Sequence, residues 1–191
     1  MVPVSLAGDS NQDRQLWNTY FSWARSVLDP KRRQELARKA QFRRISRHKA
    51  AHLQAIVFAA FALEYRVKRI YKVLGLAHRE KDTLGSLLSH FRHRVETAER
   101  LDGHGRVQLP AQWKSIEARL RELNRFRNSI AHANYQQVLD FLPNDARRSR
   151  AVARRCFNAL VDAIHVTNKA IGYETLSESD ATRYYRKLKI R

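Results

Sequence analysis

Apolar residues recur every three or four positions along most of the chain, which is the spacing of helices that each bury one face. Five segments carry this pattern, at residues 11–28, 53–74, 82–101, 111–131 and 145–171. Asp29-Pro30 and the two glycines of 102–110 mark the turns between them, and Asp82 is the predicted N-cap of the helix that reaches Leu101. We therefore predict an all-α fold, an up-and-down bundle of four to five core helices.

The predicted helices divide the chain into three parts. Residues 1–30 contain an N-terminal helix that we expect to pack on the bundle. Residues 31–176 form the bundle and begin with a long basic helical segment, because 31–49 holds nine Lys or Arg against one acid, Glu35. We expect this arm to be exposed, as single-signed charge runs are. Residues 177–191 form a short, basic C-terminal helix.

One cation falls on an apolar stripe. Arg127 follows Leu120 by seven residues and Leu123 by four, so the pattern places it on the inward face of its helix. An unpaired buried charge is costly, and the side chain must reach solvent or find a partner. Glu64 lies on the stripe of the 53–74 helix and is the partner that we predict. The alternative is that Glu64 pairs with Lys68, four residues on, at the helix surface.

Polar side chains suited to phosphate chemistry follow Arg127. Asn128 and His132 are four residues apart and share a helix face, and Tyr135 comes three residues later. Chemistry on a phosphate diester needs a group that moves a proton and a cation that stabilises the phosphorane-like transition state. His132 can serve as acid or base, and the fork of Arg127 matches two phosphate oxygens. Asn128 can orient His132 or donate to the phosphate.

The Arg-x4-His spacing alone is not specific, since it also occurs from Arg43 to His48. Asn128, directly after the Arg, and the place at the end of a core helix set Arg127–His132 apart. This stretch resembles the R-x4-6-H motif of the HEPN superfamily, whose members usually carry a polar residue after the Arg.

The resemblance implies a four-to-five-helix bundle, commonly a homodimer, with two copies of the motif facing each other. Many members are metal-independent ribonucleases that act as toxins or phage-defence effectors. In one branch, paired with a nucleotidyltransferase antitoxin, a Tyr sits two residues after the His, whereas Tyr135 sits three after His132. Arg127 and His132 point about 140° apart in an ideal helix. The helix is therefore distorted between them, or a second subunit completes each site, and the resemblance favours the second subunit.

The formal charge of +19 and the pI near 10.9 favour a polyanionic partner: nucleic acid, an anionic membrane or an acidic protein. Two clusters are predicted to bind RNA. Their members are Arg43, Arg44, Arg47 and Lys49 in the arm, and Arg147, Arg148, Arg150, Arg154 and Arg155 at the start of the last long helix. Cations are disfavoured at a helix N-terminus, so a bound phosphate would relieve a local conflict there.

Other chemistries find little support in the sequence. The single cysteine, Cys156, leaves no internal disulfide or cysteine-based zinc site, fits a reducing cytoplasm and reads as core filling. His90 and His93 alone make a weak metal pair, and we expect no metal or cofactor. The longest apolar run, 55–63, is about half a membrane span. With no targeting segment evident, we expect a cytoplasmic protein without membrane partners.

Three functions remain open. The first, which we favour, is a dimeric HEPN-type endoribonuclease, a toxin or defence effector that an antitoxin or other defence protein restrains. The second is a non-catalytic nucleic-acid-binding bundle, in which Arg127 and His132 are structural. The third is a subunit that docks an acidic protein within a defence complex. In each case we expect Tyr135 to be a packing or interface residue and not a catalyst.

Overall fold

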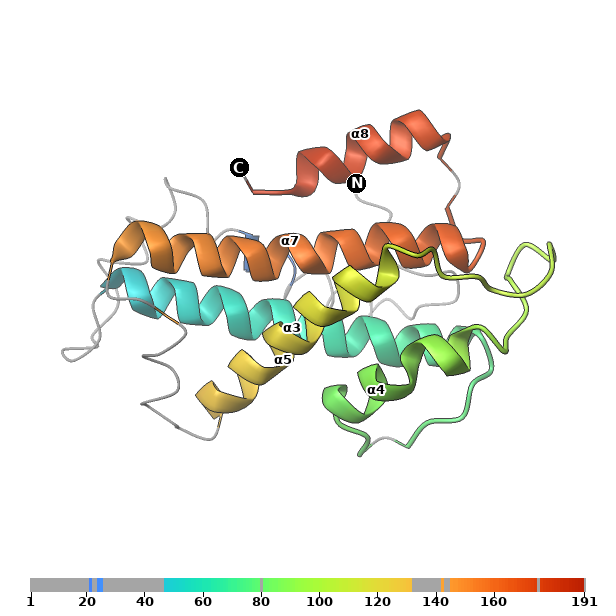
Figure 1. Cartoon of the computed structure of the whole chain (residues 1–191), viewed down its shortest axis with the longest axis horizontal. Helices are drawn as coiled ribbons and strands as arrows, with labels where there is room; N and C mark the ends of the chain where they lie inside the picture. Colours follow the sequence, from blue (N-terminus) through green and yellow to red (C-terminus); the bar gives the residue numbers. More distant parts are fainter. Residues whose placement is uncertain are drawn as a thin grey trace.

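The computed structural model describes residues 21, 24–25, 47–79, 81–131, 142, 145–174 and 176–190. In these ranges the chain forms helices, named α3 (Arg47–Val73), α4 (Leu84–Val95), α5 (Trp113–Ala131), α7 (Ala146–Ala170) and α8 (Glu178–Leu188) (Figure 1). A single bridge between Glu99 and Arg106 is the only sheet-type pairing among the described residues. The predicted all-α helical bundle is confirmed.

The two longest helices, α3 and α7, lie side by side and form the centre of the molecule (Figure 1). They run in the same direction, since His52 near the start of α3 contacts Ser149 near the start of α7, and Arg66 contacts Asn168 further along both. α5 crosses them obliquely in the opposite sense, with α4 beside it. The chain thus departs from strict up-and-down order at its central pair.

Small side chains line the centre of α3. Ala55, Ala59 and Ala62 are at most 1% exposed and lie on one side of the helix, where they allow a close approach to its neighbours. The predicted stripe of α7 is confirmed, because Cys156 and Leu160 are buried in the core. Among the described helices none is long and apolar enough to cross a membrane.

Some helix boundaries differ from the predicted ones. Thr83 caps α4, its side chain accepting from the backbone N–H of Ser86, whereas Asp82 accepts from the backbone N–H of Arg79. α4 also ends at Val95, not at Leu101, because the chain turns back there and pairs Glu99 with Arg106. The last two helices start where they were predicted to, with Asp145 as the N-cap of α7 and Ser177 as the N-cap of α8.

The N-terminal part of the chain is described at few positions. Phe21 and Ala24 are buried, and the Phe21 ring lies 5.3 Å from that of Phe157 on α7, so these two residues pack on the bundle. Most of the predicted N-terminal helix lies outside the described residues. α3 begins at Arg47, so the last residues assigned to the basic arm belong to the core helix. The rest of the arm, residues 31–46, lies outside the described residues.

A buried polar chain joins three helices. The guanidinium of Arg66 on α3 donates to the amide oxygen of Asn168 on α7, and that amide donates to the hydroxyl of Tyr185 on α8 at 2.7 Å. All three residues are at most 4% exposed. Burial raises the pKa of Tyr185, with Glu174 adding to the shift, so the phenol stays protonated and can serve this chain. α8 is therefore part of the fold and not an appended tail.

Candidate active site on the last turns of α5

Arg127 lies at the edge of the buried face of α5, not at its centre. The core positions of this helix include Leu120 and Leu123, as predicted, but the next one is Phe126, which is 3% exposed. The side chain of Arg127 is 29% exposed. A helix that crosses its neighbours obliquely buries a slightly different face at each end, and this rotation moves Arg127 to the rim.

The predicted ion pair between Arg127 and Glu64 is confirmed, with Nη2 of the Arg 3.6 Å from Oε2 of the Glu. The alternative partner is present as well, because the Nζ of Lys68 lies 2.9 Å from Oε1 of the same carboxylate. Glu64 thus bridges two cations, and the three groups together carry one net positive charge. An anion that approaches this point meets a surplus of positive charge.

Two further contacts fix the guanidinium. Its Nη1 donates to the amide oxygen of Asn128 at 3.0 Å, and its Cζ lies 5.8 Å from the centre of the Phe61 ring. Phe61 precedes Glu64 by three residues, so both side chains come from one face of α3. A guanidinium has five N–H donors, and these contacts leave several of them for a ligand. The group is both held and partly exposed, as a phosphate-binding arginine must be.

Asn128 has a role that the sequence did not predict. Because its amide oxygen accepts from Arg127, the amide positions that guanidinium and keeps its own N–H donors for another partner. The predicted alternatives, orienting His132 or donating to a phosphate, both use those donors. His132 itself lies outside the described residues, one residue beyond Ala131 at the end of α5.

The structure brings together part of the predicted group. Arg127, Asn128 and Glu64 form one cluster with Phe61 and Lys68. The remaining predicted positions are not described: Tyr135, Arg43 and Arg44 as whole residues, and Arg47 and Lys49 in their side chains. The sequence analysis missed Phe61, because the sequence does not show which aromatic residue of an apolar helix will contact a cation on another helix.

The basic cluster of α7 presents four exposed arginines: Arg147 and Arg148 in the first turn, and Arg154 and Arg155 further on. Arg150 is half-buried. Arg155 is bound to Glu122 of α5, with Nη2 and Oε1 2.6 Å apart, so its charge is already balanced. Within the described residues, Arg155 is the one member of the cluster that forms an ion pair.

The described residues contain no group of three or more His, Cys, Asp or Glu that could hold a metal ion. Cys156 is 2% exposed, and burial raises the pKa of its thiol to about 12. It is core filling, as predicted. A thiolate nucleophile is not available at this position near neutral pH.

No family model, no curated protein and no solved structure matches this chain.

Proposed function

We propose that this chain is a metal-independent endoribonuclease of HEPN type, acting on RNA in the cytoplasm as a toxin or phage-defence effector. The observation that carries the proposal is the placement of Arg127. Glu64, Asn128 and Phe61 hold its guanidinium at the rim of α5 with donors left over, immediately before the stretch that ends in His132. This is how a phosphate-binding arginine is pre-organised.

In the proposed reaction the 2′-hydroxyl of a ribose attacks the adjacent phosphorus. The bond to the 5′-oxygen of the next nucleotide breaks, which leaves a 2′,3′-cyclic phosphate and a 5′-hydroxyl end. His132 moves the proton between the attacking and leaving oxygens, and Arg127 stabilises the charge that develops on the phosphoryl oxygens. No metal takes part in these steps. Asn128 holds the guanidinium and donates to the phosphate.

The active form that we propose is a homodimer. Arg127 and His132 diverge by about 140° on an ideal helix, so one copy alone does not aim both groups at one phosphate. Two copies with their motifs facing each other would supply an arginine from one subunit and a histidine from the other. An antitoxin or another defence protein would restrain this site in the cell.

The test is cleavage of total RNA with EDTA present. We expect the wild type to cut and to leave cyclic phosphate ends, while Arg127→Ala and His132→Ala lose at least about 100-fold in rate, the range of a lost proton-transfer or charge-stabilising group. Arg125→Ala is the matched control, because Arg125 is an exposed cation on the same helix. Circular dichroism and sizing would establish that all variants fold and associate alike. Equal cleavage by all four proteins would refute the proposed site.

One observation favours a second, non-catalytic function. The contacts of Arg127 with Glu64 and Phe61 would also be expected if Arg127 had only a structural role, that of holding α5 against α3. In that case the chain is a non-catalytic subunit that binds nucleic acid or docks a partner in a defence complex. RNA binding without cleavage, weakened by loss of Arg147 and Arg148 but not of Arg127, would support this alternative.

A further inference from the structure

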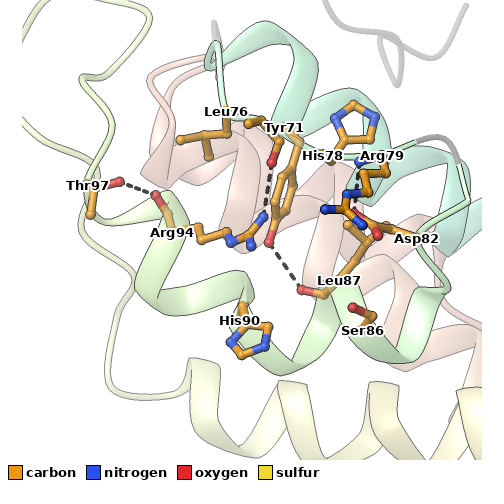
Figure 2. Close-up of a pocket in the computed structure, with 11 residues that line it drawn as sticks. Tyr71, Leu76, His78, Arg79, Asp82, Ser86, Leu87, His90, Arg94 and Thr97 are labelled. Atoms are coloured by element: carbon orange, nitrogen blue, oxygen red, sulfur yellow. Dashed lines mark hydrogen bonds between the residues drawn. The ribbon is translucent and has the colours of Figure 1, made fainter.

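A second polar site lies beside Tyr71 and Leu87, at the edge of the core. A pocket of about 510 Å³ opens between the end of α3, the loop that follows it and α4 (Figure 2). This volume lies within the range of about 300–1,000 Å³ that is usual for small-molecule sites. The α3 residue that lines this pocket, Tyr71, lies seven residues beyond Glu64, or about 10 Å along the helix.

The inner wall is apolar and rigid. Tyr71 is fully buried, and its hydroxyl donates to the backbone oxygen of Leu87 at 3.2 Å. Leu76 and Ala77 continue this wall. Burial is the main cause that raises the pKa of Tyr71, so the phenol remains neutral and keeps its hydrogen bond. A ligand here would meet a preformed surface.

Two arginines flank this wall in different ways. Arg94 on α4 lies with its Cζ 5.9 Å from the centre of the Tyr71 ring, and its Nη1 donates to the backbone oxygen of Ala77 at 3.0 Å. Its other guanidinium donors are not engaged by any described group. Figure 2 shows Arg94 on one side of the Tyr71 ring and Arg79 on the other. Arg79 is exposed and makes no side-chain ion pair within the described residues.

A carboxylate and two imidazoles complete the lining. Asp82 holds the loop, since its Oδ2 accepts from the backbone N–H of Arg79 at 2.9 Å, and it leaves its other oxygen for a ligand. His78 packs edge-on against Tyr71 with ring centres 6.0 Å apart, and His90 lies on the α4 side of the pocket (Figure 2). With neutral imidazoles, the arginines and the aspartate sum to one positive charge.

We propose that this pocket binds a small phosphomonoester whose organic part carries hydrogen-bond donors. Arg79 and Arg94 supply forked donors that match phosphate oxygens. Asp82 accepts from a hydroxyl or amino group of the ligand and repels a bare anion. The apolar wall and the volume leave room for more than a phosphate group. A nucleoside monophosphate and a sugar phosphate share this chemistry.

The test is calorimetric titration of the full-length protein with four probes: AMP, ribose 5-phosphate, ribose and inorganic phosphate. We expect at least one of the two monoesters to bind more tightly than ribose and inorganic phosphate, and the stronger of the two identifies the organic part. Arg79→Gln and Arg94→Gln should each weaken that binding about tenfold or more, as loss of a charge-assisted contact does. Arg106→Gln is the matched control, an exposed arginine outside the pocket.

A second readout places the ligand without any substitution. The ring resonances of His78 and His90 should shift in NMR spectra on titration, while those of His104, an exposed residue that does not line the pocket, should not. Absence of monoester binding would overturn the proposal. Inorganic phosphate that binds as tightly as both monoesters would also overturn it. The same holds if Arg106→Gln weakens monoester binding as much as Arg79→Gln does, because the ligand would then be attracted only by the overall charge of the protein. None of these measurements depends on RNA cleavage, so this proposal and the ribonuclease proposal can fail separately.

Discussion

At the residue scale, the environment of each ionisable group decides what it can do. Arg127 and Arg66 are both arginines in the bundle, but Arg66 is 4% exposed and donates into the core, whereas Arg127 is 29% exposed at the rim. The first contributes to a fixed structure, and only the second can meet a ligand. Glu64 is the residue that keeps Arg127 in place without burying it.

We predict that Glu64→Gln lowers RNA cleavage about 10–100-fold, because a displaced catalytic group costs rate steeply. Stability should change by about 1 kcal/mol or less, since the pair is partly exposed to solvent. Glu117→Gln is the control: it removes a comparable ion pair, with Arg121 on α5, away from the motif. Rate assays and thermal melts of both variants make the comparison. An unchanged rate for Glu64→Gln would show that the carboxylate does not position Arg127.

A second prediction concerns Cys156, the only cysteine of the chain. Its thiol pKa of about 12, against an ordinary value of 9.0, makes the thiolate about 1,000-fold scarcer in the folded protein near neutral pH. A thiol reagent such as DTNB should therefore react very slowly with the native protein and at once in denaturant. Rapid stoichiometric reaction of the native protein would contradict the buried position.

At the element scale, the ends of helices and the contacts between them set the architecture. α5 is tied to α7 by Arg119–Asp162 at 3.1 Å and by Glu122–Arg155 at 2.6 Å. The C-terminal end of α7 is held by close packing at a glycine. Gly172 has a φ of 73°, and a Cβ added there would lie 2.5 Å from Cγ of Asp102, which is bound to Arg100. The loop after α4 therefore packs directly against this glycine.

We predict that Gly172→Ala destabilises the protein by about 2–5 kcal/mol, from the left-handed backbone and the clash together. Gly75→Ala is the control. It has a φ of 66° but no atom within 4 Å of the added Cβ, so it should cost only about 1–2 kcal/mol. Denaturant unfolding of both variants measures the difference. Equal losses would mean that Asp102 moves aside without cost.

At the scale of the whole molecule, the excess of cations is not spread evenly. Lys and Arg total 37 against 18 Asp and Glu. Many acids are engaged in ion pairs between or within helices, as Asp162, Glu122 and Glu117 are. The first turns of α7, with Arg147 and Arg148, have no such balance among the described residues. A polyanion should therefore be attracted to that end of α7.

We predict that the double variant Arg147→Gln/Arg148→Gln makes RNA binding less sensitive to salt. The slope of log K against log salt is negative, and its magnitude should fall by about 1.4–1.8, or about 0.7–0.9 for each lost phosphate contact. Arg186→Gln/Lys187→Gln removes the same charge from exposed positions of α8 and is the control. Filter binding over a range of salt concentrations gives the slopes. If both double variants reduce the magnitude of the slope equally, the net charge of the protein and not this surface governs RNA binding.

The sequence predicted those features that depend on local periodicity. The stripe of α7, the starts of α7 and α8 near Asp145 and Ser177, and the pairing of Glu64 with Arg127 all follow from spacing along a helix and the cost of a buried charge. The early end of α4 did not follow, because the pairing of Glu99 with Arg106 that stops it is not helical.

Features that depend on how helices lie in space were also missed. The parallel course of α3 and α7 and the rotation that brings Arg127 to the rim arise from crossing angles, which a single helix does not encode. The pocket beside Tyr71 joins side chains from a helix end, a loop and a second helix. Whether His132 and Tyr135 complete the site with Arg127 stays a prediction.

The hydrogen bond from Arg66 to Asn168 has a consequence for synthesis on the ribosome. The two residues are 102 positions apart, so at about 5–20 residues per second Asn168 is added about 5–20 s after Arg66. Tyr185, which completes the polar chain, comes later still. α3 therefore cannot reach its final packing before α7 has been synthesised. The bundle should close only after α8 has followed, and a chain that stalls before α8 should remain a target for chaperones.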